Sequence, residues 1–118
     1  MAKIVFSEAA ASLAHALTAE MMPLYDEPTE AIVAIRWSSG TRDNQRGPNG
    51  EVVWEVTEFP SWVCEVAPWG KTKGNPIAKY TIKIDDLNVL LINPERATEG
   101  ILFVDAADGA FSVEHRAI

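Results

Sequence analysis

The chain of 118 residues has the length of one domain, and 47% hydrophobic and 23% charged residues are typical of a soluble globular protein. We therefore expect residues 1–118 to form a single domain. Seventeen acidic residues against ten basic ones leave a net charge of −7, which argues against a protein that coats duplex nucleic acid. One cysteine and two histidines cannot supply an internal disulfide or a Cys/His structural zinc site.

The N-terminal residues do not have the pattern of a signal peptide, because a run of only three apolar residues precedes Ser7 and Glu8. No stretch of the sequence approaches the roughly 20 apolar residues that a membrane-spanning helix needs. We therefore expect a cytoplasmic protein that has no membrane partner.

One helix is predicted near the N-terminus. Ser7 is a good N-cap, Glu8 falls in the first turn, and Ala, Leu, Met and Glu dominate up to Met22, before Pro23 ends the helix. This periodicity places small and apolar side chains on one narrow face, which suits close packing on a sheet. The residues of that face are Ala10, Leu13, Ala14, Leu17 and Met21.

Beyond residue 30, short runs of β-branched and aromatic residues alternate with turn residues, and this pattern predicts strands. The predicted strands are 31–37, 51–58, 62–67, 79–84, 87–92, 101–104 and 110–114, with one helical turn after residue 93. The connections are too short for crossover helices, so we expect mostly antiparallel pairing. The sequence therefore predicts an α+β fold, with one N-terminal helix packed on a mostly antiparallel sheet of six or seven strands.

Two polar, glycine-containing segments are predicted to be loops that bind a small anionic ligand such as a nucleotide. Residues 38–50 carry Arg42 and Arg46, and residues 68–76 carry Trp69, Lys71 and Lys73. If the two loops meet at one end of the sheet, the cations could hold phosphate while Trp69 stacks on a base. The alternative is a pair of solvated hairpin loops.

Three further motifs do not indicate chemistry. The Gly-Lys-Thr at 70–72 lacks the first glycine of a phosphate-binding loop, because Glu65 occupies that position. The stretch 105–109 lacks two of the ligands of a calcium loop and is better explained by an Asp-Gly hairpin turn. Cys64 falls on the apolar face of its predicted strand, which predicts a buried, unreactive thiol. We therefore predict no catalytic residue, no metal site and no cofactor.

Trp37, Trp54 and Trp62 fall on successive predicted strands. Alternation allows each of them to lie on the apolar face, so the simplest interpretation is that all three belong to the core. Three indoles are bulky for one small core, however, and each N–H group needs a hydrogen-bond partner. The alternative is that one of them lines a pocket or an oligomer interface.

An acidic cluster surrounds the end of the predicted helix, beside a tyrosine and a leucine that we expect to be exposed. Such a surface could dock on a basic partner, and the alternative is a solvated loop. The candidate partner-binding residues are Glu20, Leu24, Tyr25, Asp26, Glu27 and Glu30.

The function predicted from these patterns is that of a non-enzymatic, acidic binding protein. It would act by occupying a macromolecular partner, most readily a protein, as an inhibitor, immunity or accessory protein does. An open sheet of this size must cover its edges, so a homodimer is also expected. The alternatives are the small anionic ligand described above, held at a subunit interface, and an enzyme that uses His115 or a loop carboxylate as acid or base.

Overall fold

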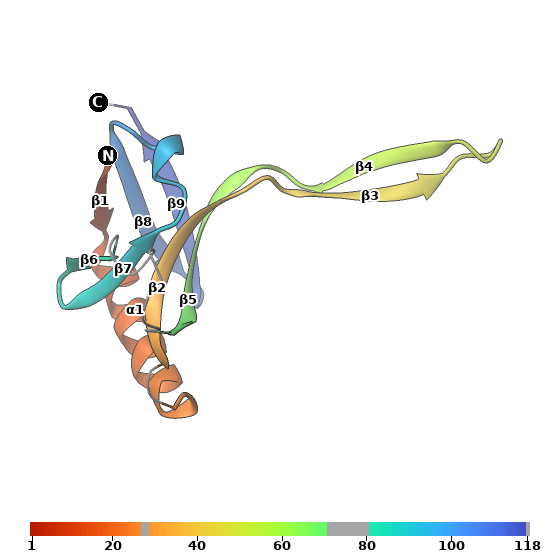
Figure 1. The fold of residues 1–118 in the computed structure, drawn as a ribbon. Helices are drawn as coiled ribbons and strands as arrows, with labels where there is room; N and C mark the ends of the chain where they lie inside the picture. Colours follow the sequence, from red (N-terminus) through yellow and green to blue (C-terminus); the bar gives the residue numbers. More distant parts are fainter. Residues whose placement is uncertain (27–28, 71–80, 118) are drawn as a thin grey trace.

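The computed structural model describes residues 1–26, 29–70 and 81–117 (Figure 1). Its helical elements are α1 (Glu8–Met21) and the short 3-10 helices η1 (Met22–Leu24) and η3 (Pro94–Arg96). The strands are β1 (Lys3–Phe6), β2 (Thr29–Ser38), β3 (Thr41–Arg46), β4 (Val52–Glu58), β5 (Ser61–Gly70), β6 (Thr81–Ile84), β7 (Leu87–Leu91), β8 (Ile101–Ala107) and β9 (Ala110–Arg116).

The predicted α+β class is confirmed, because one α-helix packs against a system of strands. The strands of the described residues form three sheets, in the orders β1-β8-β9, β5-β2-β7-β6 and β3-β4. Four of the six pairings are antiparallel, while β1–β8 and β2–β7 are parallel. The strands outnumber the six or seven expected because the sequence pattern does not reveal two of them. β1 has only four residues, and β3 is entirely polar.

Helix α1 begins and ends where the sequence predicts. The side chain of Ser7 accepts a hydrogen bond from the backbone N–H of Ala10, which satisfies one of the free donors at the helix start. Ala10 and Ala14 are fully buried, and the other members of the predicted apolar face are half-buried. The small side chains let the helix approach the sheet closely.

The main core lies between α1 and the two larger sheets. Strand β2 has five consecutive buried residues, from 31 to 35, as expected of a strand that is covered on both faces. The largest completely buried side chains come from β2, β7 and β8, and no polar or charged side chain of the described residues is buried. These side chains are Ile32, Val33, Ile35, Val89, Leu90, Leu102 and Val104.

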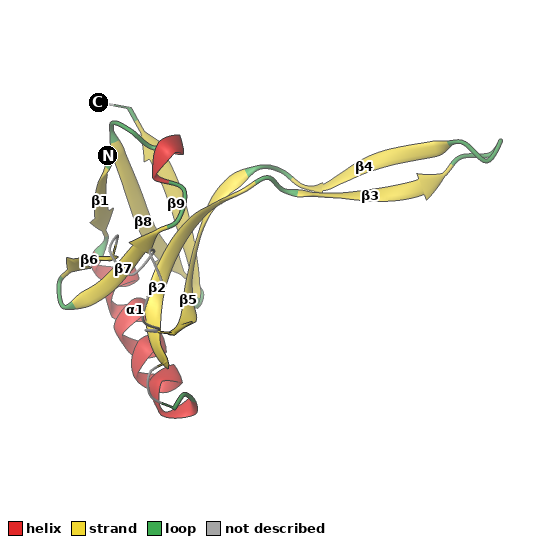
Figure 2. Cartoon of the chain, viewed as in Figure 1, coloured by secondary structure: helices red, strands yellow, loops and turns green. Residues whose placement is uncertain are grey.

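The molecule is elongated because a two-stranded hairpin leaves this core. We call residues 39–60, which contain β3 and β4, the arm (Figure 1). The Cα radius of gyration is 17.1 Å, whereas a compact chain of this length would have a value of about 13 Å. The ribbon coloured by secondary structure shows no other helix or strand beside the arm (Figure 2).

The arm continues the longest antiparallel pairing in the structure. Strands β2 and β5 pair over ten residues, from Thr29–Gly70 to Ser38–Ser61, and β3 and β4 resume the pairing beyond Gly40 and Pro60. Residues 41–46, predicted as part of a loop, are therefore a strand. Backbone pairing with the β-branched strand β4 overrides the low strand propensity of these polar residues.

Candidate functional site

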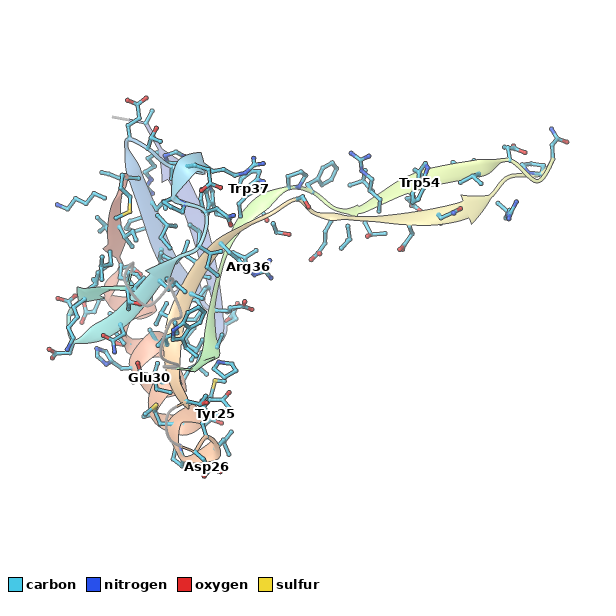
Figure 3. All side chains as sticks on the ribbon, in the orientation of Figure 1. Tyr25, Asp26, Glu30, Arg36, Trp37 and Trp54 are labelled. Atoms are coloured by element: carbon cyan, nitrogen blue, oxygen red, sulfur yellow. The ribbon has the colours of Figure 1, made fainter. Side chains whose placement is uncertain are left out.

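The arm is fastened to the core by an aromatic and cationic cluster at its base. Trp37 and Trp62 are paired across β2 and β5, and their ring centroids lie 5.5 Å apart in an edge-to-face arrangement. The guanidinium carbon of Arg96 lies 5.3 Å from the centre of the Trp37 ring, and the backbone N–H of Trp37 donates to Asn93 Oδ1 over 2.8 Å. Trp37 marks the place of this cluster, where β2 leads into the arm (Figure 3).

The tip of the arm is a tight turn held by local hydrogen bonds. The backbone N–H of Gly47 donates to the carbonyl of Glu51 over 2.8 Å, and that of Gly50 donates to the carbonyl of Gly47 over 3.0 Å. The Arg46 guanidinium also donates to the carbonyl of Gly50 over 3.1 Å. The arm is thus closed at its tip as a β-hairpin.

Strand pairing sorts the side chains of the arm onto two chemically different faces. Residues that pair directly across an antiparallel ladder share a face, and successive residues alternate. One face, which we call the Trp54 face, combines apolar side chains with two arginines and an asparagine. Its members are Arg42 with Val56, Asn44 with Trp54, and Arg46 with Val52.

The opposite face, which we call the acidic face, carries two carboxylates and no cation. Its pairs are Asp43 with Glu55 and Gln45 with Val53. The Gln45 amide donates to the Glu55 carboxylate, so the polar side chains of this face satisfy part of one another's hydrogen bonding. Of the two faces, only the Trp54 face offers several large apolar side chains together with positive charge.

Apolar side chains on the arm are exposed to an unusual degree. Every residue of β3 and β4 is exposed, and the side chain of Trp54 retains 63% of its accessible surface. Nine large hydrophobic residues are exposed in the described part of the chain, and five of them are on the arm. These five are Val52, Val53, Trp54, Val56 and Phe59. Three of them, Val52, Trp54 and Val56, share the Trp54 face, and exposed apolar side chains gathered on one face mark interaction sites.

The prediction that all three tryptophans belong to the core is wrong for Trp54. Trp62 packs against the main core and Trp37 is half-buried beside it, whereas Trp54 lies out on the arm, away from the body (Figure 3). The local sequence signal for the arm is its turn. Gly-Pro-Asn-Gly at 47–50 precedes the predicted strand 51–58, whereas the polar residues 41–46 have no strand pattern of their own.

Of the residues predicted to bind a small anion, the three that the structure describes do not come together. Arg42 and Arg46 lie on β3 of the arm, whereas Trp69 lies near the far end of β5, opposite Glu30 of β2. Trp69 is not on a loop, because the pairing of β2 with β5 continues to Gly70. Its indole N–H is enclosed and has no hydrogen-bond partner within the described residues. Lys71 and Lys73 lie outside these residues.

The predicted partner-binding residues that the structure describes lie around the end of α1 and the start of β2. Glu20 lies in the last turn of α1, Leu24 ends η1, and Tyr25 and Asp26 follow (Figure 3). Leu24 retains 73% of its accessible surface, and the neighbouring Met22, which sequence reasoning did not select, is also exposed. Tyr25, which was expected to be exposed, is half-buried. We call Glu20, Met22, Leu24, Tyr25 and Asp26 the helix-end surface. Glu30 is half-buried at the start of β2, and Glu27 lies outside the described residues.

The buried thiol predicted at position 64 is confirmed. Cys64 is buried on β5, and burial, with a smaller contribution from the negative charge of Glu65, raises its pKa to about 12. A thiol with this pKa stays protonated near neutral pH and is a poor nucleophile. Among the described residues, no group of three or more His, Cys, Asp or Glu side chains is arranged to hold a metal ion, and no helix is long and apolar enough to span a membrane.

Comparison with known proteins found no family, no curated protein and no solved structure that matches this chain.

Proposed function

We propose that this chain is a non-enzymatic binding protein, of inhibitor, immunity or accessory type, and that it engages a protein partner through the Trp54 face of the arm. The observation that carries the proposal is the exposure of Val52, Trp54 and Val56 on one side of a hairpin that projects beyond the core. An isolated two-stranded hairpin is only marginally stable in water. Its apolar residues gain most when a partner covers them.

The composition of the Trp54 face fits a protein interface. Trp and Arg are the residues most enriched among those that dominate binding energy, and this face presents Trp54 between Arg42 and Arg46. The arm is also anchored at its base, through the pairing of Trp37 with Trp62. A pre-oriented arm loses less conformational freedom on binding than a loop would, which favours affinity.

The small-ligand alternative has less support. Arg42 and Arg46 are four residues apart on one strand, and the Arg46 guanidinium already donates to the carbonyl of Gly50. The arm is an extended ribbon, whereas small-molecule sites are concave and bury most of the ligand. Arginines spread along a ribbon suit an extended protein surface better.

A pair of neighbouring substitutions on opposite faces of the arm tests the proposal. Trp54→Ala removes the central side chain of the Trp54 face, and Val53→Ala is the matched control on the acidic face. We expect Trp54→Ala to weaken partner binding by about 2 kcal/mol or more, roughly thirtyfold in Kd. The partner would be recovered by co-purification from cells that produce the native protein, and its affinity measured by calorimetry.

Both substituted residues are exposed, so neither change should lower the melting temperature appreciably. Partner binding that is equally strong in the two variants would rule out the Trp54 face as the docking surface.

A further inference from the structure

We propose that the partner of the arm is a second copy of this chain, whose helix-end surface receives the Trp54 face. This inference rests on the proposed function, because it names the occupant of the same arm. It is drawn from the match in charge and in apolar surface between two parts of the molecule that cannot reach each other within one copy.

The helix-end surface favours a partner that brings positive charge. The C-terminal end of an α-helix carries the negative end of its dipole, and the last turn of α1 contains no basic residue. Glu20 in that turn and Asp26 beyond η1 add exposed carboxylates. The sequence has no Lys or Arg between Lys3 and Arg36, so the chain segment that forms this surface carries no cation of that kind of its own. Glu20 is unfavourable for the helix itself, and a cation brought by a partner would relieve this cost.

The same surface also exposes large apolar side chains. Leu24 and Met22 are two of the four exposed large hydrophobic residues that lie outside the arm in the described part of the chain. A group of carboxylates that contacts only water would not need large apolar side chains beside it. The helix-end surface is thus acidic and apolar, whereas the Trp54 face is basic and apolar, so the two are complementary in both respects.

The two surfaces lie at opposite ends of strand β2. The strand starts at Thr29, next to the helix-end surface, and runs ten residues to Ser38 at the base of the arm, which is a distance of roughly 30 Å. The arm then extends beyond the body, so that Trp54 is far from Tyr25 and Asp26 (Figure 3). A contact between these surfaces must therefore join different copies. Such a contact produces a closed dimer when two copies exchange arms reciprocally, and otherwise a larger ring or a filament, because each copy offers one arm and one helix-end surface.

Sedimentation velocity of the purified full chain, from low micromolar to several hundred micromolar concentration, tests this inference. We expect the sedimentation coefficient to rise with concentration and the association to weaken as salt is added, since exposed charges are screened.

Two charge-reversed variants identify the surfaces involved. Arg42→Glu with Arg46→Glu reverses the charge of the Trp54 face, and Glu20→Arg with Asp26→Arg reverses that of the helix-end surface. We expect each variant alone to associate at least tenfold more weakly than the wild type, while an equimolar mixture of the two regains assembly, because each reversed surface then finds a complementary one. Asp43→Arg, on the acidic face of the same arm, is the control and should assemble normally. Circular dichroism would confirm that every variant is folded.

Two results would overturn the inference. If the wild-type chain stays monomeric at all concentrations, the partner of the arm is not a second copy. The proposed function would still hold in that case if Trp54→Ala abolished binding to a different protein. Assembly that depends on Arg42 and Arg46 but tolerates reversal of Glu20 and Asp26 would show that the arm contacts some other surface, such as the arm of a second copy.

Discussion

At the scale of single residues, Ser7 links the start of α1 to the end of β8. Its hydroxyl accepts from the Ala10 N–H and donates to Asp105 Oδ1 over 2.6 Å, and the Ala106 N–H donates to the same carboxylate oxygen over 2.8 Å. These two hydrogen bonds, that of Ser7 above all, hold the pKa of Asp105 below its ordinary value. The ionised carboxylate therefore favours the folded state.

Substitution of Ser7 by Ala is expected to lower the free energy of unfolding at neutral pH by about 1 kcal/mol, because the helix loses its N-cap. The sign of the pH effect follows from the lowered pKa of Asp105. Its stabilising contribution is complete above the ordinary pKa of an aspartate and is lost as the pH falls through the lower pKa of the folded state. Urea unfolding at neutral pH measures the effect of Ser7→Ala. Urea unfolding of the wild type and of Asp105→Asn, at neutral and at acidic pH, measures the contribution of Asp105.

The Asp105→Asn variant should lose less stability than the wild type over that acidic range. If both chains lose the same amount, Asp105 does not contribute to the acid dependence of folding.

At the scale of elements, the base of the arm depends on a glycine. Gly40 has a φ of +83°, and a Cβ at this position would lie 2.3 Å from the carbonyl oxygen of Glu58. Gly50 at the tip has a φ of +80°, but a Cβ there would meet no atom within 4 Å. A side chain would strain the left-handed backbone at both positions. Only at Gly40 would it also clash with a neighbouring atom.

We expect Gly50→Ala to cost about 1–2 kcal/mol of local stability through the left-handed backbone alone. Gly40→Ala should cost more, because the backbone at the base of the arm must also move away from Glu58. Hydrogen exchange of the β3 and β4 amides, followed residue by residue by NMR, measures the opening of the arm. Equal exchange rates in the two variants would contradict the role assigned to the base.

Most elements follow directly from the sequence, and the arm shows why the rest do not. Ser7 and Pro23 delimit α1, and the alternating runs mark seven of the nine strands in the described residues, including β4. The interpretation of β4 as a core strand was wrong because alternation shows which side chains share a face, and does not show what covers that face. Strand β3 was not predicted because pairing with β4, and not the strand propensity of its own polar residues, holds it extended.

The candidate site residues were also predictable only in part. The acidic and apolar residues around position 24 are close in sequence, so local reasoning could bring them together. Whether Arg42 and Arg46 lie near Trp69 depends on the direction in which the hairpin leaves the sheet. Ten paired residues of β2 and β5 separate the base of the arm from the end of β5, and no local pattern encodes that separation.

At the scale of the whole molecule, a body with a buried core carries an exposed, projecting arm, which we propose to be the binding element. The body buries its core without any buried polar side chain in the described residues, whereas the arm leaves Trp54 and its neighbours to water. Site-specific photo-crosslinking tests this proposal most directly. A benzophenone amino acid would replace Trp54 in the full-length chain, and in a second sample it would replace Val53, on the opposite face of the same arm.

On irradiation in cells, we predict that position 54 forms one discrete cross-linked product, while position 53 gives little or none. The mass of that product reports the partner, and a mass equal to two copies of the chain identifies the partner as a second copy. An absence of cross-linking at position 54, or equal cross-linking at positions 54 and 53, would contradict binding through the Trp54 face.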